Sequence, residues 1–477
     1  MPSSIASLLT FIFVITLYLW DHRRNKDMSP ALWLPVLWML PAASRFPSQW
    51  LLLGDPAATS NVTDGSTTDA AYFLVLILWG GMILLRRHVV SASFIRQNFW
   101  FFAFLLFGLV SILWSDFQFV AFKRWVKILG HPIMAFIILT DANPVRALRV
   151  VMYRCAFILV PVSVLFIKYW PAYGRYFNYF DGSGLYRGVS LSKNELGTVC
   201  VIFGLFFLWR ILARKDEPDV RLRREQLAVN FGFLGLTIYL LFLANSAASL
   251  VTFAIGTVTM IGLGMPFVSK RFFGTYFLAV IVVVGLAELG FGLYEQLIEA
   301  LGKDPTLTDR TEVWADVFAL QTRPWIGAGF ESFWLGSRLE AMWAKWWWQP
   351  NQAHNGYVET YLNLGFIGVG LLSLLVVSAF RRITSHLQTD FEYSRFRLAL
   401  LFAILAYNIT EATFKGVALS WTMFHLVVLT YPRAATAAVK TPQATPRSYG
   451  QRVAEIEHPD GSRAKHGQTA HYRSHLR

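Results

Sequence analysis

Apolar residues in this chain come in blocks of roughly 20 residues, about the length that crosses a bilayer as a helix, and short polar connectors separate them. The second block contains Pro35, Pro41 and Arg45, so we expect it to be broken or re-entrant. The expected fold is an all-α polytopic integral membrane protein with about 12–13 transmembrane helices. The predicted spans lie near residues 4–20, 31–53, 70–86, 99–113, 119–140, 150–169, 195–211, 228–244, 247–266, 273–292, 358–380, 396–411 and 416–432.

Composition supports the membrane class. The chain is 55% hydrophobic and 15% charged, whereas a soluble domain has roughly 25% charged residues. The formal charge of +14 comes from basic residues at the ends of apolar blocks and in the C-terminal tail, so it indicates topology and not nucleic-acid binding. Cys155 and Cys200 lie inside apolar segments, which argues against a disulfide framework or a thiolate metal site.

Lys and Arg residues concentrate in alternate short loops, a distribution that favours the cytoplasmic side for those loops. The N-terminus is then expected outside and the tail from Pro432 inside. The predicted organisation is N-terminal transmembrane helices over 1–292 with a periplasmic loop at about 170–194, a large periplasmic catalytic loop over 293–357, C-terminal transmembrane helices over 358–432, and a disordered cytoplasmic tail over 433–477.

The long external segment carries the first candidate for chemistry. Thr308 or Asp309 can cap a helix that begins at Arg310, with Glu312 near its start. The free N–H groups of a helix start and a forked guanidinium both suit phosphate oxygens, so Arg310 is a candidate anion ligand. An ordinary surface arginine is the alternative.

His354 directly precedes the apolar run that starts near Tyr357, so it is expected at the external membrane surface. An imidazole can accept a proton from a sugar hydroxyl at neutral pH, which suits a general base in glycosyl transfer. A histidine that makes structural hydrogen bonds at a helix cap is the alternative. Acidic residues in the segment lack the paired spacing of glycoside hydrolases, and no metal-binding cluster stands out.

Three further patterns lie outside the predicted membrane spans. Arg187 and Lys193-Asn194 place positive charge in the other external loop, where an anionic partner is expected: a lipid-linked diphosphate or phospholipid head groups. Trp343, Trp346 and Trp347 have the spacing of one helical face, which predicts an interfacial aromatic belt or a surface for sugar stacking. Gly327-Ala328-Gly329 is interpreted as a structural turn.

These motifs resemble the signature region of the bacterial O-antigen ligase and O-antigen polymerase superfamily. The resemblance rests on Arg310-Thr311-Glu312-Val313-Trp314, then Pro324 to Phe330, His354-Asn355-Gly356-Tyr357 and Leu364 to Gly368. Arg187-Gly188 followed by Lys193-Asn194-Glu195-Leu196-Gly197 is similar to the upstream element of the exopolysaccharide polymerase branch. The match covers about residues 190–370.

The resemblance implies a GT-C-like glycosyltransferase of the bacterial inner membrane that acts on the periplasmic face. Its donor would be an undecaprenyl-diphosphate-linked oligosaccharide, and membrane lipids and other polysaccharide export proteins would be its partners. His354 would activate the acceptor hydroxyl and Arg310 would stabilise the departing diphosphate in an inverting reaction without metal or cofactor. Substrate-binding roles are expected for Arg187, Lys193, Asn194, Trp314, Asn355, Tyr357 and Glu359.

One departure from the family pattern bears on the reaction. Ligases of the family show an arginine after a serine in the short external turn that here reads Ala244-Asn245-Ser246-Ala247-Ala248-Ser249. Its absence and the Lys-Asn element favour a polymerase over a ligase, with Arg187 or Lys193 as the replacement. A transporter of lipid-linked glycans is the rival of a different class. It should place polar and charged groups near the bilayer midplane, often with Gly or Pro breaks in matched halves, and this sequence shows no such repeat.

Overall fold

The structure is a computed structural model that describes residues 1–51, 65–178, 182–214, 219–276 and 310–431. Within these ranges the chain is almost wholly helical, and the only sheet is the antiparallel pair β1 (Arg175–Phe177) and β2 (Gly184–Tyr186). The main helices are α1 (Ser3–Arg24), α2 (Trp33–Ala42), α3 (Pro47–Leu51), α4 (Thr67–Arg86), α5 (Ala92–Gln97), α6 (Phe99–Val110), α7 (Gln118–Ile128), α8 (Gly130–Leu139), α9 (Pro144–Tyr169), α10 (Pro171–Gly174), α11 (Lys193–Leu212), α12 (Val220–Ala244), α13 (Ala247–Leu263), α16 (Arg310–Ala319), α17 (Gly336–Lys345), α18 (Gly356–Ser385), α19 (Phe391–Thr410) and α20 (Leu419–Val428).

Six of the described helices are long and apolar enough to cross a membrane: α1, α4, α9, α11, α12 and α18. Shorter apolar helices, among them α13 and α20, pack between them. Because backbone groups in a bilayer must pair within the protein, an apolar helical bundle is the expected solution. The prediction of an all-α polytopic membrane protein is therefore confirmed.

Several predicted spans have different internal structure. The second span is broken as expected, because α2 ends at Ala42 and α3 begins at Pro47. The span predicted over 119–140 consists of two helices, α7 and α8, which meet at Leu129. Most of the span predicted over 273–292, the first part of the large loop and the tail predicted to be disordered lie outside the described residues.

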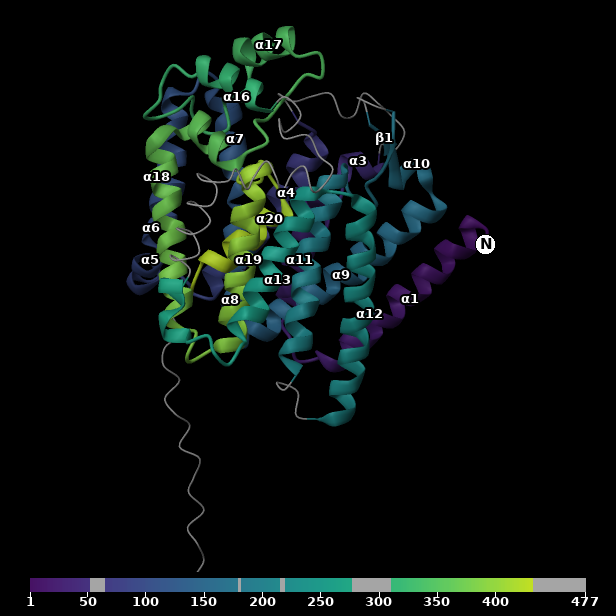
Figure 1. Ribbon diagram of the computed structural model, residues 1–477. Coiled ribbons are helices and arrows are strands. Elements are labelled where there is room, and N and C mark those ends of the chain that lie inside the picture. Colours follow the sequence, from purple (N-terminus) through teal and green to yellow (C-terminus); the bar gives the residue numbers. More distant parts are fainter. Residues whose placement is uncertain (52–64, 179–181, 215–218, 277–309, 432–477) are drawn as a thin grey trace, which may run out of the picture. The chain divides into compact units, whose positions relative to one another are not determined.

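The centre of the bundle is formed by α11, which packs against α12, α13 and α19 (Figure 1). Small residues permit this close approach. A Cβ on Gly197 of α11 would lie 2.1 Å from the hydroxyl oxygen of Ser249 at the start of α13. The turn before α13, where ligases of the resembled family carry an arginine, is thus packed directly against the first turns of α11.

Successive loops along the sequence lie at alternate ends of the bundle. At one end, Arg24 pairs with Glu225 at 3.0 Å and Arg146 pairs with Asp27 at 2.6 Å. At the other end lie α16, α17 and the β1–β2 hairpin (Figure 1). We call this second end the loop end, and every candidate site residue lies on its loops or on helix turns that adjoin them.

Candidate active site

A buried carboxylate gathers three of the predicted site residues at the loop end. Glu411 directly follows α19 and is 7% exposed. Its Oε1 accepts a hydrogen bond from Asn194 Nδ2 at 2.6 Å and lies 3.4 Å from Arg310 Nη2. Its Oε2 lies 3.5 Å from His354 Nδ1. Glu411 therefore brings together groups from the upstream Lys-Asn element, α16 and the loop before α18.

His354 has a backbone conformation that few side-chain-bearing residues adopt, with φ of 48°. Its preceding residue is held on both sides, since Ala353 N donates to Glu359 Oε1 at 2.6 Å and Ala353 O accepts from Trp314 Nε1 at 2.8 Å. Left-handed residues of this kind cluster at functional sites, where the surrounding contacts stabilise them. These contacts fix the backbone of the loop next to His354.

Arg310 is the first described residue of α16. One guanidinium nitrogen, Nη1, donates to the backbone oxygen of Thr410, and the other faces Glu411. The side chain is 17% exposed. The guanidinium is thus fixed next to the histidine with part of its surface open. The predicted caps Thr308 and Asp309 lie outside the described residues.

The loop that enters α11 carries the second cationic group. Arg187 donates from Nε to the backbone oxygen of Tyr173 at 3.1 Å, and its guanidinium carbon lies 5.7 Å from the ring centre of Tyr176. The backbone N–H of Lys193 donates to the Tyr176 hydroxyl at 3.2 Å. Burial raises the pKa of Tyr176, so the hydroxyl stays neutral. The next residue, Asn194, joins this loop to Glu411.

Arg45 also belongs to this region, although the sequence analysis treated it only as a break in a span. Its Nη2 donates at 2.6 Å to the same Tyr173 oxygen that Arg187 uses. Burial, followed by the neighbouring Arg187, lowers the pKa of Arg45 to about 10, so it remains charged at neutral pH. A charged residue inside an otherwise apolar block was the signal available in the sequence.

Four residues predicted to bind substrate are engaged by the protein itself. Asn355 caps α18 by accepting from Tyr357 N and Val358 N, and the Tyr357 hydroxyl donates to the backbone oxygen of Leu405. Trp314 holds Ala353, as described above. Glu359 is 3% exposed and accepts from Trp334 Nε1 at 2.8 Å as well as from Ala353 N. In the structure their contacts hold the loop that carries His354.

The glycine turn over 324–330 is structural, as predicted, and it supports the same loop. Helix α18 is kinked at Gly365, where φ is 64°, and Phe366 N donates to Pro324 O at 2.9 Å across the kink. Ala328 N donates to Leu362 O at 3.0 Å. A Cβ on Gly327 would lie 2.3 Å from the backbone of Asn363, so only glycine fits. The turn thus locks the first turns of α18 in place.

The prediction that Trp343, Trp346 and Trp347 share one helical face is wrong. Helix α17 ends at Lys345, so Trp346 and Trp347 lie beyond it and do not continue the face of Trp343. Trp346 is 9% exposed and donates to Asp316 at 2.9 Å, whereas Trp347 is 66% exposed. The helix stops because Trp346 adopts an extended backbone conformation at its C-cap. Tertiary contacts therefore separate residues that helical spacing placed together.

The assembled cluster contains an imidazole with a carboxylate behind one nitrogen and a guanidinium beside it. Glu411 can favour a proton on Nδ1, which leaves Nε2 as the basic nitrogen. The guanidinium supplies fixed positive charge. Glu411 gives no signal in the sequence, because it ends a predicted membrane span and belongs to no recognised motif.

Comparisons with known proteins match the region of the chain that carries this site. A family model described as O-antigen ligase matches residues 231–373, a segment that runs from α12 into α18 and includes Arg310 and His354. The exopolysaccharide production protein ExoQ of Rhizobium meliloti (strain 1021) is 27% identical over 320 residues, which are 64% of this chain and 69% of that protein. The resemblance is confirmed: this membrane protein is similar to the O-antigen ligase family over residues 231–373 and, more widely, to an exopolysaccharide production protein.

Proposed function

We propose that the protein is a membrane glycosyltransferase that polymerises undecaprenyl-diphosphate-linked oligosaccharide units during surface polysaccharide or exopolysaccharide synthesis. The observation that carries the proposal is the meeting of His354, Arg310 and Asn194 at Glu411. The exopolysaccharide role in the name of the relative and the O-antigen ligase family match support the same class of chemistry.

In the proposed reaction an acceptor hydroxyl attacks the anomeric carbon of the donor glycan. Its proton passes to Nε2 of His354, the bond between the anomeric carbon and the diphosphate oxygen breaks, and the diphosphate keeps the electron pair. Arg310 stabilises the developing negative charge, with Arg187 and Lys193 as further cationic contacts. A single displacement inverts the anomeric centre. The loop end would face the periplasm.

The proposed roles of these residues follow from their charges. A diphosphate needs cations, and Arg310, Arg187 and Lys193 lie on loops tied to one another through Glu411, Asn194 and Tyr176. Glu411 would orient the imidazole and balance part of that positive charge while the donor is absent. The arginine absent from the turn before Ser246 would thus be replaced by cations on the neighbouring loop before α11.

A ligase that transfers a finished glycan to a lipid acceptor is the second candidate, because the matching family model is described as O-antigen ligase. Both candidates predict the same use of His354 and Arg310. They differ in the intermediate that accumulates when catalysis stops. A polymerase defect leaves single repeat units, whereas a ligase defect leaves long chains on the lipid carrier.

The test is a deletion strain complemented with the wild-type protein, His354→Ala or Arg310→Ala. His386→Ala and Arg381→Ala are matched controls, because both residues are exposed and lie away from the loop end. Membrane levels of each variant are measured along with the polysaccharide. Loss of long chains with retained single units supports a polymerase. Full polymer from both site variants would refute catalysis at this site and favour the transporter.

A further inference from the structure

Two basic residues of the loop end lie on the outer surface of the bundle and take no part in the proposed reaction. Lys168 is in the last turn of α9, and Arg175 is the first residue of β1. Both are exposed. Strand β1 and α10, which joins it to α9, lie at the loop end (Figure 1). Because alternate residues of a strand face opposite sides, Arg175 and Phe177 share one exposed face and Tyr176 lies on the other.

The fold itself brings the two cations together. Arg175 Nε donates at 2.8 Å to the backbone oxygen of Ile167, the residue before Lys168. Gly174 permits this close approach, because a Cβ there would lie 2.3 Å from the backbone of Phe166. Arg175 is therefore held against the same turn of α9 that carries Lys168.

No carboxylate in the described ranges forms an ion pair with either residue. The guanidinium carbon of Arg175 lies 5.5 Å from the ring centre of Tyr186, and Nζ of Lys168 lies 5.4 Å from that of Tyr239. Both cations thus rest on aromatic rings and keep their charge. On the periplasmic side, where the proposed function puts the loop end, basic residues are disfavoured, so such a pair indicates an anionic ligand.

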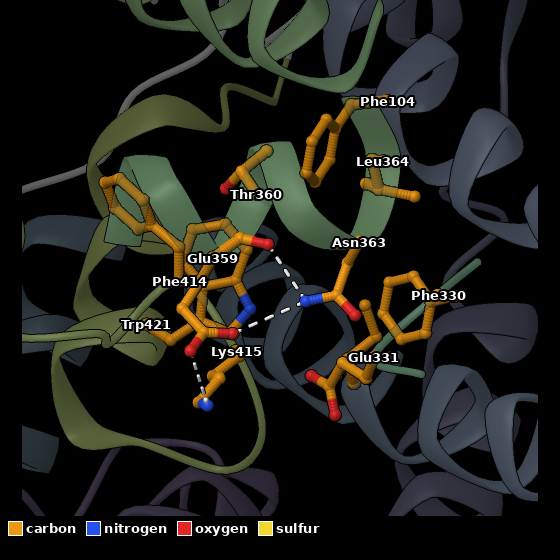
Figure 2. Close-up of a pocket in the computed structure, with 11 residues that line it drawn as sticks. Phe104, Phe330, Glu331, Glu359, Thr360, Asn363, Leu364, Phe414, Lys415 and Trp421 are labelled. Atoms are coloured by element: carbon orange, nitrogen blue, oxygen red, sulfur yellow. Dashed lines mark hydrogen bonds and ion pairs between the residues drawn. The ribbon is translucent and has the colours of Figure 1, made fainter. Parts of the chain in front are cut away.

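A second lysine of the loop end shows the contrast. Lys415 lines the small pocket drawn in Figure 2, and its Nζ lies 3.3 Å from Oε1 of the buried Glu359. That lysine has its anion within the protein. Lys168 has no such partner among the described residues, and its side chain faces outward where a ligand can reach it.

The surroundings of the pair are those of a membrane surface. Trp170, two residues after Lys168, is 37% exposed and donates from Nε1 to Ser7 Oγ at 3.0 Å. Phe177 of β1 and Phe242 of α12 are 75% and 67% exposed. Exposed tryptophan among apolar side chains is typical of the boundary between lipid and water. An anion bound here would therefore be the head group of a lipid.

The hairpin connects this surface to the candidate active site. Arg175 pairs with Tyr186 in the β1–β2 ladder, and the next residue along the chain is Arg187. On the opposite face of β1, the hydroxyl of Tyr176 accepts from Lys193 N at 3.2 Å. One face of the hairpin thus presents Arg175 to the membrane surface, and the other lies beside the cations of the candidate site.

We propose that Lys168 and Arg175 bind the diphosphate of the lipid-linked donor at the membrane surface, before it passes to Arg187 and Arg310. This inference rests on the proposed function. A diphosphate diester carries more negative charge than the single phosphate of a phospholipid, so it matches a pair of cations better. The polyprenyl chain stays in the bilayer beside the apolar surface of α12. The pair raises the local concentration of donor next to the site.

The test is photocrosslinking in purified full-length protein held in nanodiscs of phosphatidylcholine. The photoreactive group is introduced as Phe177→p-benzoylphenylalanine, because this position shares the exposed face of Arg175. The probe is radiolabelled undecaprenyl diphosphate, which carries the lipid and the diphosphate without sugar. Radiolabelled phosphatidylglycerol is the competing phospholipid.

The main variant combines Lys168→Gln with Arg175→Gln. Lys168→Gln alone is the second variant, because it removes charge without removing a hydrogen bond from the described fold. The matched control combines Lys270→Gln with Arg271→Gln, an exposed basic pair beyond the far end of α13.

The double variant is expected to lower crosslinking of undecaprenyl diphosphate by about tenfold and Lys168→Gln by about threefold, as for loss of cations near a membrane surface. The control pair and Arg310→Ala should stay within about twofold of wild type. Equal crosslinking by wild type and the double variant overturns the proposal. Capture of phosphatidylglycerol in place of undecaprenyl diphosphate also overturns it and assigns the pair to phospholipids.

Kinetics and a catalytic variant keep this inference separable from the proposed function. With the lipid-linked repeat unit as donor, the double variant should raise the donor KM and leave kcat within about twofold of wild type. A fall in kcat with an unchanged KM contradicts a role in donor capture. Crosslinking needs no turnover, so its retention in His354→Ala supports the lipid site even if polymer assays refute catalysis by His354.

Discussion

Nδ1 of His354 lies 3.5 Å from Oε2 of Glu411, and the two residues come from loops before α18 and after α19. This distance is longer than a strong hydrogen bond but short enough for the carboxylate to orient the ring electrostatically. Glu411 also accepts a hydrogen bond from Asn194 and pairs with Arg310. One buried carboxylate therefore connects the imidazole to α16 and to the loop that enters α11.

Glu411→Gln should lower glycosyl transfer by roughly 10²–10⁴-fold, because the neutral amide no longer orients a protonated Nδ1 or balances Arg310. The measurement is polymer formation in membranes with equal amounts of each protein. Glu340→Gln is the control for removal of an acidic charge. Wild-type rates in Glu411→Gln would show that the carboxylate has no part in catalysis.

Arg310→Lys should lose at least about tenfold in activity, although it keeps the positive charge. A lysine cannot reproduce the fork that reaches both Thr410 O and Glu411. Arg310→Ala should lose about 10²-fold or more, since a charge that stabilises the leaving group is then absent. The quantity to compare is kcat/KM for the donor. Arg381→Lys serves as the control, and wild-type activity in Arg310→Lys would contradict a role for the fork.

Trp314→Phe removes the donor to Ala353 O and keeps an aromatic ring. We expect a loss of about 1 kcal/mol in stability from the missing hydrogen bond and a severalfold fall in activity, because the His354 loop is less firmly held. Thermal unfolding and transfer rate are measured on the same preparation. Trp325→Phe, at an exposed tryptophan, is the control. A change in stability without a change in rate would limit Trp314 to a structural role.

Tyr176→Phe should make unfolding less sensitive to alkaline pH. Burial raises the pKa of Tyr176, so the fold favours the neutral phenol. The stability tied to this group is therefore fully present below its ordinary pKa and falls as pH rises toward the raised value. Unfolding of wild type and variant compared from neutral to alkaline pH checks the sign. A steeper alkaline loss in the variant would contradict it.

Cysteine labelling should place the two ends of the bundle on opposite sides of the membrane. Ser337→Cys on α17 should react with an impermeant maleimide once the outer membrane is permeabilised, and Ser385→Cys at the end of α18 only after the inner membrane is opened. Both serines are exposed, and the native Cys155 and Cys200 are buried. The reverse pattern would put the loop end in the cytoplasm and exclude a periplasmic donor.

Hydropathy and local motifs were enough to determine the class of fold. The apolar blocks predicted a helical membrane protein because the bilayer leaves few other ways to pair the backbone. The structural nature of the turn at Gly327 was also readable, since local backbone preferences decide it. His354 and Arg310 were found as candidates from residue chemistry and family resemblance.

Only the tertiary structure decided which groups meet. Glu411 and Arg45 belong to no local motif, and each acquires its surroundings from loops distant in sequence. The same is true of the left-handed conformations of His354 and Glu331, which their neighbours impose against local preference. Periodicity describes a helix face only while the helix continues, which is why the tryptophan face failed at Trp346. Local sequence encodes backbone preference and apolar pattern, whereas the convergence of charged groups depends on packing between helices.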